Sequence, residues 1–121
     1  MEWSPTGPTM QYQEISVSEL QKRLSDGSGA QFIDVREPEE LSQSQLDGFV
    51  NLPLSQYQQW APRLEEVLDP GRETIVLCHH GIRSADMCAF LLRRGFKDVK
   101  NVRGGIHAYS LYVDPSVPQY Y

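Results

Sequence analysis

The sequence contains little cysteine, a minority of basic residues and no long hydrophobic run. Two cysteines among 121 residues cannot form the disulfide framework of a small secreted domain, so we expect a reducing, cytoplasmic setting. Its 11 basic residues are outnumbered by 16 acidic ones, which argues against a general nucleic-acid binder, because such proteins displace counterions with a basic face. No signal peptide and no membrane-spanning run are visible. We therefore expect a soluble protein with neither nucleic acid nor membrane as partner.

The residues that are present are typical of one compact domain. Apolar residues make up 40% and charged residues 22% of the chain, as in ordinary globular proteins. Residues 1–12 have no periodic pattern and contain prolines and glycine, so we predict a flexible N-terminal tail. Residues 13–121 are predicted to form a single domain that includes a C-terminal tail, and we expect a monomer.

Strand-like and helix-like segments alternate along this domain. Ser16, three residues before Glu19, is the signature of a capping box and predicts a short helix after a short strand. Further strands are predicted at residues 30–35, 49–54, 74–78 and 98–102. Helical segments are predicted at residues 37–41, 55–68 with a break near Pro62, 84–94 closed by Gly95, and 106–113. The alternation indicates an α/β fold with three layers, in which helices flank a central, mostly parallel sheet of five strands.

The stretch LCHHGIRSA, residues 77–85, lies where a strand ends and a helix begins. Ligands of open α/β sheets bind at such carboxyl ends. A loop that runs directly into a helix can turn several backbone N–H groups toward the sulfur of Cys78 and so stabilise a thiolate. Gly81 permits the turn, and Arg83 adds a permanent charge for an oxyanion. Taken alone, this pattern also fits a buried structural cysteine beside two solvated histidines.

The segment from Cys78 to Arg103 is the basic part of this acidic chain. It contains six Lys or Arg residues against two Asp residues. This surplus could draw a small anion toward the loop. Alternatively, Arg93, Arg94 and Lys97 complement the negative end of the preceding helix.

Four blocks of the sequence resemble the rhodanese homology domain in order. CHHGIRS, residues 78–84, is similar to the active-site loop of that family in the spacing of cysteine, glycine, arginine and serine. The other blocks are FIDVREPEEL at residues 32–41, GFVNLPL at 48–54 and GFKDVKNVRGGIHAY at 95–109. The resemblance covers roughly residues 14–120. The chain departs from the family pattern at residues 44–48 and at Tyr109, which stands where the family has tryptophan.

This resemblance implies a rhodanese-like fold and a single-domain sulfurtransferase of the thiosulfate type. Cys78 would take the outer sulfur of a small anionic donor such as thiosulfate as a persulfide, and a thiol or cyanide would remove it. Asp34 and Arg36 are expected to support the sheet end beneath the loop. The residues expected to contact the donor are those that follow the nucleophile: His79, His80, Gly81, Ile82, Arg83 and Ser84. No cofactor is implied.

Two other functions stay open at this stage. Phosphatases and arsenate reductases of the same fold have five residues between cysteine and arginine, whereas four separate Cys78 from Arg83, and this count favours sulfur over phosphate. The second alternative is a persulfide relay or interaction module that delivers sulfur to a specific protein acceptor. The tail VDPSVPQYY, residues 113–121, resembles the ends of rhodanese domains attached to E1-like adenylyltransferases and makes this alternative more specific.

The remaining histidines and cysteine are given structural roles. We expect no metal site, because Cys78, His79 and His80 are consecutive and their side chains should not converge on one ion. His79 or His80 could instead serve as a general base. His107 is expected to be structural or solvent-facing. Cys88 is expected in the core, with resolution of an oxidised Cys78 as the alternative.

Overall fold

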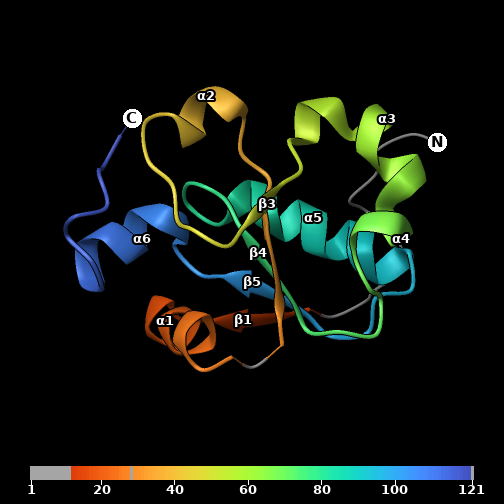
Figure 1. Cartoon of the computed structure of the whole chain (residues 1–121), viewed down its shortest axis with the longest axis horizontal. Helices are drawn as coiled ribbons and strands as arrows, with labels where there is room; N and C mark the ends of the chain where they lie inside the picture. Colours follow the sequence, from red (N-terminus) through yellow and green to blue (C-terminus); the bar gives the residue numbers. More distant parts are fainter. Residues whose placement is uncertain (1–11, 28, 121) are drawn as a thin grey trace.

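The computed structural model describes residues 12–27 and 29–120 of the chain. The tail predicted at residues 1–12 therefore lies outside the described residues, apart from Tyr12. The strands are β1 (Gln13–Ile15), β2 (Gln31–Asp34), β3 (Val50–Asn51), β4 (Thr74–Leu77) and β5 (Val99–Val102). The α-helices are α1 (Val17–Ser25), α2 (Pro38–Leu41), α3 (Tyr57–Trp60), α4 (Leu64–Val67), α5 (Ile82–Arg93) and α6 (Gly105–Tyr112), as Figure 1 shows. Short 3-10 turns, Leu54–Gln56 and Ala61–Arg63, adjoin α3.

The five strands form one sheet in the order β1-β5-β4-β2-β3. Every described pairing is parallel, so the predicted mostly parallel sheet is confirmed and is parallel throughout. In its central register, Val76 of β4 lies between Ile33 of β2 and Asn101 of β5. This order places β4 at the centre of the sheet, with its carboxyl end between those of β2 and β5.

Hydrophobic side chains of β4 pack on both faces of the sheet. Val76 faces a core cluster that contains Leu64 and Met87, from α4 and α5. Its neighbours Ile75 and Leu77 belong to a second cluster, which is filled by side chains of α1 and α6. Successive side chains of a strand point to opposite faces, so both faces of β4 are covered by helices. The molecule therefore has the three predicted layers, and the two groups of helices can be followed in Figure 1.

The observed boundaries follow the sequence signals closely. Ser16 accepts a hydrogen bond from the Glu19 N–H, and the Glu19 side chain reaches back to the Ser16 backbone, so the capping box is confirmed. The strand predicted over residues 49–54 is shorter, because Pro53 has no N–H to continue the ladder. Residues 54–67 form broken helical turns, as the pattern around Pro62 predicts. In the described part of the chain, no helix combines the length and the apolar character needed to cross a membrane.

Candidate active site

Cys78 lies directly after the central strand and is only 1% exposed. The carbonyl of Leu77 accepts a hydrogen bond from the Val35 N–H, and the carbonyl of Cys78 accepts one from Ile106 at 2.9 Å. The start of the loop is therefore fixed on both sides, by the segment that follows β2 and by the first turn of α6. The reactivity of the Cys78 sulfur would therefore be governed by surroundings that these hydrogen bonds hold in place and that largely exclude solvent.

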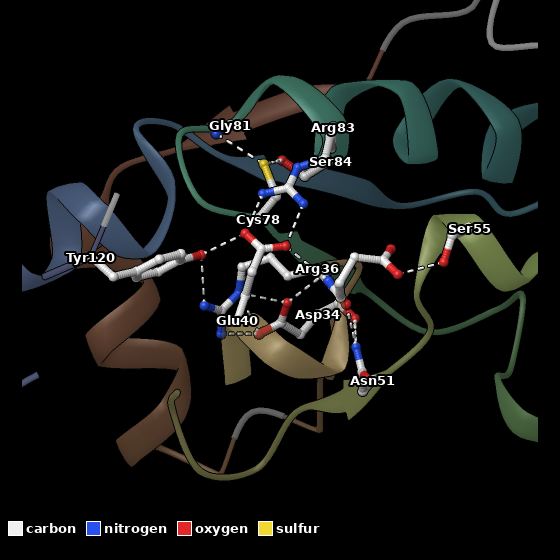
Figure 2. A network of polar contacts seen from close by, with 11 residues as sticks. Asp34, Arg36, Glu40, Asn51, Ser55, Cys78, Gly81, Arg83, Ser84 and Tyr120 are labelled. Carbon is white, nitrogen blue, oxygen red and sulfur yellow. Dashed lines mark hydrogen bonds and ion pairs between the residues drawn. The ribbon is translucent and has the colours of Figure 1, made fainter. Parts of the chain in front are cut away.

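Two groups contact the sulfur of Cys78. The backbone N–H of Gly81 donates to Sγ at 3.0 Å, and the hydroxyl of Ser84 lies 3.2 Å from Sγ (Figure 2). Gly81 has φ +99°, a left-handed conformation that glycine adopts without strain and that brings its N–H back onto the sulfur. The sequence analysis predicted that several loop amides donate to the sulfur. Among residues 12–27 and 29–120, one amide does, that of Gly81. The second group in contact with the sulfur is the Ser84 hydroxyl.

Ser84 is fully buried and is held by Asn101 of β5. The Asn101 amide nitrogen donates to the Gly81 carbonyl at 3.1 Å and to the Glu14 carboxylate at 3.2 Å, so its oxygen Oδ1 is left to accept from the Ser84 hydroxyl. A hydroxyl has one proton to donate. Ser84 therefore donates either to Asn101 or to the sulfur. The predicted contact of Ser84 with a substrate stays a prediction; in this structure its partners are the sulfur and Asn101.

Arg83 is engaged by a carboxylate that the sequence analysis did not single out. Its guanidinium donates to both oxygens of Glu40, at 2.6 and 2.8 Å. These hydrogen bonds lower the pKa of Glu40 to about 2 and raise the pKa of Arg83 above its usual range. Arg83 was expected to offer a free charge to an oxyanion, but in this structure Glu40 neutralises it. The signal for Glu40 was its place in the block FIDVREPEEL, residues 32–41.

Acidic residues also neutralise other members of the basic segment. Arg94 pairs with Glu65 at 2.8 Å, and Lys100 pairs with Glu73 at 2.7 Å and with Asp98 at 2.6 Å. Two of these partners, Glu65 and Glu73, come from segments far away in sequence. Three of the six basic residues of this segment, Arg83, Arg94 and Lys100, are therefore paired with carboxylates.

Asp34 and Arg36 form a buried ion pair at the carboxyl end of β2. The guanidinium of Arg36 lies 2.7 Å from Asp34 Oδ2, and both side chains are almost fully buried. Arg36 also donates to the hydroxyl of Tyr120 at 3.0 Å, and Tyr120 donates to Glu40 at 2.8 Å. Figure 2 shows the resulting chain of contacts from Asp34 through Glu40 to Arg83. The structure thus places Asp34 and Arg36 where support of the loop was predicted, and it adds Tyr120 from the C-terminal segment.

Tyr120 fills the space between this network and the loop. Its ring stacks on the imidazole of His79, with centroids 4.0 Å apart and planes 11° from parallel. Burial raises the pKa of the Tyr120 hydroxyl, and the hydrogen bond from Arg36 opposes that rise. The resemblance of the C-terminal tail to the ends of rhodanese domains marked this segment, but nothing local in the sequence identified the ring as a contact of His79.

The rings of the two loop histidines lie close to each other and to that of His107. The ring centroids of His79 and His80 lie 3.9 Å apart, and the ring of His107 lies 4.9 Å from that of His80. The two residues follow β4, which ends at Leu77, so their side chains are not bound to the alternation of a strand. The backbone N–H of His107 donates to the His79 carbonyl at 3.0 Å.

The surroundings of His79 disfavour its protonated form. Burial lowers its pKa first, and the neighbouring His80 lowers it further, while Glu40 opposes the change. A lowered pKa makes His79 less able to attract an anion by its charge. Its stacking between His80 and Tyr120 suits packing and ligand contact more than proton transfer.

The remaining candidate residues, Ile82 and Cys88, lie in opposite surroundings, one exposed and one buried. Ile82 is 75% exposed on the outside of the loop. Cys88 is buried in the core cluster of α5, and burial raises its pKa, so it is an unreactive thiol in this fold. A surface hollow of about 550 Å³ is lined by residues between Asn51 and Val67 and by none of residues 78–84, so it is not the site of Cys78.

Comparisons with known proteins agree with this geometry. The Rhodanese-like domain family matches residues 16–111. The chain is 46% identical over 110 residues to the chloroplastic Rhodanese-like/PpiC domain-containing protein 12 of Arabidopsis thaliana, covering 88% of this chain and 37% of that protein. It is 31% identical to a sulfurtransferase of Allochromatium vinosum, covering 86% of this chain and 94% of the relative.

A solved structure gives the same result for the fold. The crystal structure of a rhodanese-like domain protein from Staphylococcus aureus superposes with a TM-score of 0.71 at 25% identity, covering 90% of this chain and 99% of that one. The chain spans little more than a third of the length of the Arabidopsis relative and almost all of the bacterial one.

Proposed function

The chain belongs to the rhodanese-like domain family, and from this we propose that it transfers sulfane sulfur from thiosulfate or a similar anion through a persulfide on Cys78. The observation that carries the proposal is the surrounding of Cys78 Sγ. The sulfur lies at the end of the central strand, accepts from Gly81 N–H at 3.0 Å and contacts the Ser84 hydroxyl at 3.2 Å. A thiolate held by such donors is a nucleophile that needs no adjacent base.

The reaction is a double displacement. The Cys78 thiolate attacks the outer sulfur of thiosulfate, a new S–S bond forms to Sγ, and the bond to the sulfonate sulfur breaks as sulfite leaves with the electron pair. Cyanide or a thiolate then attacks the outer sulfur of the persulfide. The Sγ–S bond breaks, Cys78 recovers its thiolate, and the acceptor leaves as thiocyanate or as a new persulfide. If Cys78 rests as a thiol, its proton goes to solvent before the first attack.

The N-terminus of α5 supports the charge of the persulfide. Gly81 is the N-cap of this 12-residue helix and provides no side-chain cap, so the amides of the first turn keep their donor capacity. Helix N-termini stabilise anions through these amides and through the helix dipole. Ser84, in the same turn, adds a hydroxyl that can donate to a sulfur anion.

Access of the donor anion is expected to involve the ion pair of Arg83 and Glu40. Cys78 is 1% exposed, and the permanent charge of the loop, Arg83, is paired with Glu40. Thiosulfate is a divalent anion that can exchange with the Glu40 carboxylate for the fork of guanidinium donors. Glu40→Gln should therefore lower KM for thiosulfate by roughly threefold, measured against the exposed neighbour Glu39→Gln as control. An unchanged KM would show that Arg83 does not recognise the donor.

The central test is the covalent intermediate. Incubation with thiosulfate should add the mass of one sulfur atom to the intact protein, and cyanide or a thiol reductant should remove it. Cys78→Ser should abolish both this adduct and thiocyanate formation. Cys88→Ser is the matched control, because Cys88 is buried and its pKa is raised, and it should retain both. Thiocyanate release by Cys78→Ser at the rate of the parent would contradict the mechanism.

The second candidate function is a persulfide relay to a protein acceptor. It is supported by Ile82, an apolar side chain that is 75% exposed within the loop and could contact a partner protein. A relay would accept sulfur from a cysteine desulfurase and release little thiocyanate from thiosulfate. Comparison of the two donors, with the Cys78 adduct as readout, separates the functions. Phosphate-ester hydrolysis is not expected with four residues between Cys78 and Arg83.

We also propose a cellular setting for the protein. Both cysteines are free and buried in this fold, and a persulfide cycle needs a reduced Cys78, so we propose a reducing compartment such as the cytoplasm. The expected small-molecule partners are an anionic sulfur donor and a thiol or cyanide acceptor.

A further inference from the structure

All three histidines of the chain lie in one cluster beside the loop. The ring of His79 is 3.9 Å from that of His80 and 5.8 Å from that of His107, and the rings of His80 and His107 are 4.9 Å apart. One ring nitrogen from each residue lies within 4.8 Å of the other two. The sequence predicted no such group, because His107 is far from the other two along the chain.

Two of these imidazoles carry a buried nitrogen that has no hydrogen-bond partner. They are Nε2 of His79 and Nδ1 of His107, and neither finds a partner among the residues that the structure describes. Buried polar atoms of folded proteins are nearly always paired with protein, water or an ion. His80 is exposed, so the third imidazole opens the cluster to solvent and provides a path for a ligand.

The backbone holds the two less exposed histidines together. His107 donates its N–H to the His79 carbonyl at 3.0 Å, and Ile106 donates to the Cys78 carbonyl at 2.9 Å. Gly105 makes this approach possible, since a Cβ at that position would lie 2.3 Å from the His79 carbonyl oxygen. The stacked ring of Tyr120 limits the rotation of His79 on its other side. The cluster is therefore set by the fold.

We propose that His79, His80 and His107 bind a divalent transition-metal ion of the zinc class, with a fourth position left to water. Imidazole nitrogens are ligands that such ions prefer, and three histidines with one open position are a known zinc arrangement. Zn–N distances of about 2.0–2.1 Å in a tetrahedron place the nitrogens about 3.3 Å apart. The separations of at most 4.8 Å can close to that value by rotation of the rings of His80 and His107, with His79 held by Tyr120.

Zinc is more compatible than copper with the neighbouring thiol. Zn²⁺ has no redox chemistry, whereas copper would oxidise the thiol that precedes His79 in the chain. The site uses no sulfur atom, so it stands apart from the proposed sulfur transfer. Its occupation would still engage both loop histidines that were predicted to contact a sulfur donor.

The test is zinc binding by tag-free protein that carries Cys78→Ser, so that the thiol cannot be the ligand. Titration of Zn²⁺ against a chromophoric chelator should show one equivalent bound. Adding His107→Ala should weaken binding at least about tenfold, because metal sites lose that much even when a supporting contact is removed. Asp86→Asn, which removes an exposed carboxylate outside the cluster, is the control and should leave the affinity unchanged.

Two further measurements keep the result independent of folding. Zn²⁺ should raise the melting temperature of the Cys78→Ser protein by mass action and should not raise that of the His107→Ala double variant. Co²⁺ in the site should give the intense visible bands of tetrahedral coordination. Failure of the Cys78→Ser protein to bind zinc would overturn the proposal. Equal affinity with and without His107 would overturn it as well.

Discussion

The single proton of Ser84 has two acceptors within reach. It can go to Asn101 Oδ1 or to Cys78 Sγ, and the fixed orientation of the Asn101 amide leaves no other choice. When Cys78 is a thiol, its S–H can donate to Ser84, and when Cys78 is a thiolate, Ser84 can donate to it. Ser84 is thus suited to stabilise either form, and a fully buried hydroxyl does so without competition from water.

Ser84→Ala should slow the reaction of Cys78 with iodoacetamide at neutral pH by about tenfold, because a hydrogen bond to a charged group contributes about 1.5–3 kcal/mol. Ser110→Ala is the matched control, since Ser110 is also buried but donates to the Val117 carbonyl, away from the sulfur. The rates of alkylation by mass spectrometry provide the measurement. Equal rates for the two variants would show that Ser84 does not act on the thiolate.

Ionisation of the Glu40 carboxyl makes the free energy of unfolding depend on pH in the acid range. Its folded pKa of about 2 lies below the ordinary value of 4.5, chiefly through the hydrogen bonds from Arg83. Its contribution is therefore complete above pH 4.5 and is lost as the pH falls from 4.5 toward 2. With allowance for solvent screening, we expect about 1–2 kcal/mol.

Urea unfolding of the parent and of Glu40→Gln at a series of acid pH values checks this contribution. The difference in the free energy of unfolding between the two proteins should shrink toward zero as the pH approaches 2. Glu39→Gln should show no such pH-dependent difference. A constant difference across this range would mean that Glu40 acts through packing and not through its charge.

At the scale of elements, the start of α6 holds the loop of Cys78. Gly105 has φ +63°, and a Cβ there would lie 2.3 Å from the His79 carbonyl oxygen and 2.5 Å from that of Cys78. Backbone atoms cannot move aside as a flexible side chain can. The approach of α6 to the loop therefore depends on this glycine.

Gly105→Ala should cost about 3 kcal/mol of unfolding free energy, as the sum of a left-handed backbone penalty and a steric clash, and should reduce persulfide formation. Gly95→Ala is the control, since Gly95 has φ +92° but an added methyl group there would meet no atom within 4 Å. It should cost only about 1 kcal/mol and leave persulfide formation intact. Urea unfolding and intact mass after thiosulfate give both readouts.

Local signals predicted the elements well and their long-range contacts poorly. The runs at residues 74–78 and 98–102 became β4 and β5 to within a residue, because apolar side chains in buried strands leave a continuous pattern. Cys78, Gly81 and Arg83 were found from their spacing in one loop. Glu40, Tyr120 and His107 approach that loop only through the sheet order and the position of α6, which no local pattern encodes.

At the scale of the whole molecule, opposite charges are paired across segments. Arg83, Arg94 and Lys100 each contact acidic side chains, and the chain as a whole carries a net charge of −5. With these side chains paired and a net negative charge, we expect only a weak attractive field for a small anion. Recognition of thiosulfate would therefore depend on short-range exchange at Arg83 and little on steering.

We expect kcat/KM for thiosulfate to stay constant or to rise by less than about threefold between roughly 20 and 200 mM salt, since screening removes only a weak repulsion. Glu40→Gln should make the value fall with salt, because Arg83 is then unpaired. Steady-state rates with cyanide as acceptor provide the measurement. A fall of more than about tenfold in the parent would indicate a strong positive field at the site.

The contacts around Cys78 have a consequence for the synthesis of the chain. The network of contacts around the loop is complete only when residues 34–40, 78–84, 101–107 and 120 are all in place. A ribosome releases these segments in order, so the cysteine leaves the exit tunnel well before its last partners do. Until Tyr120 emerges, its hydrogen bonds with Arg36 and Glu40 and its stacking on His79 cannot form, so the network beside the loop is completed last.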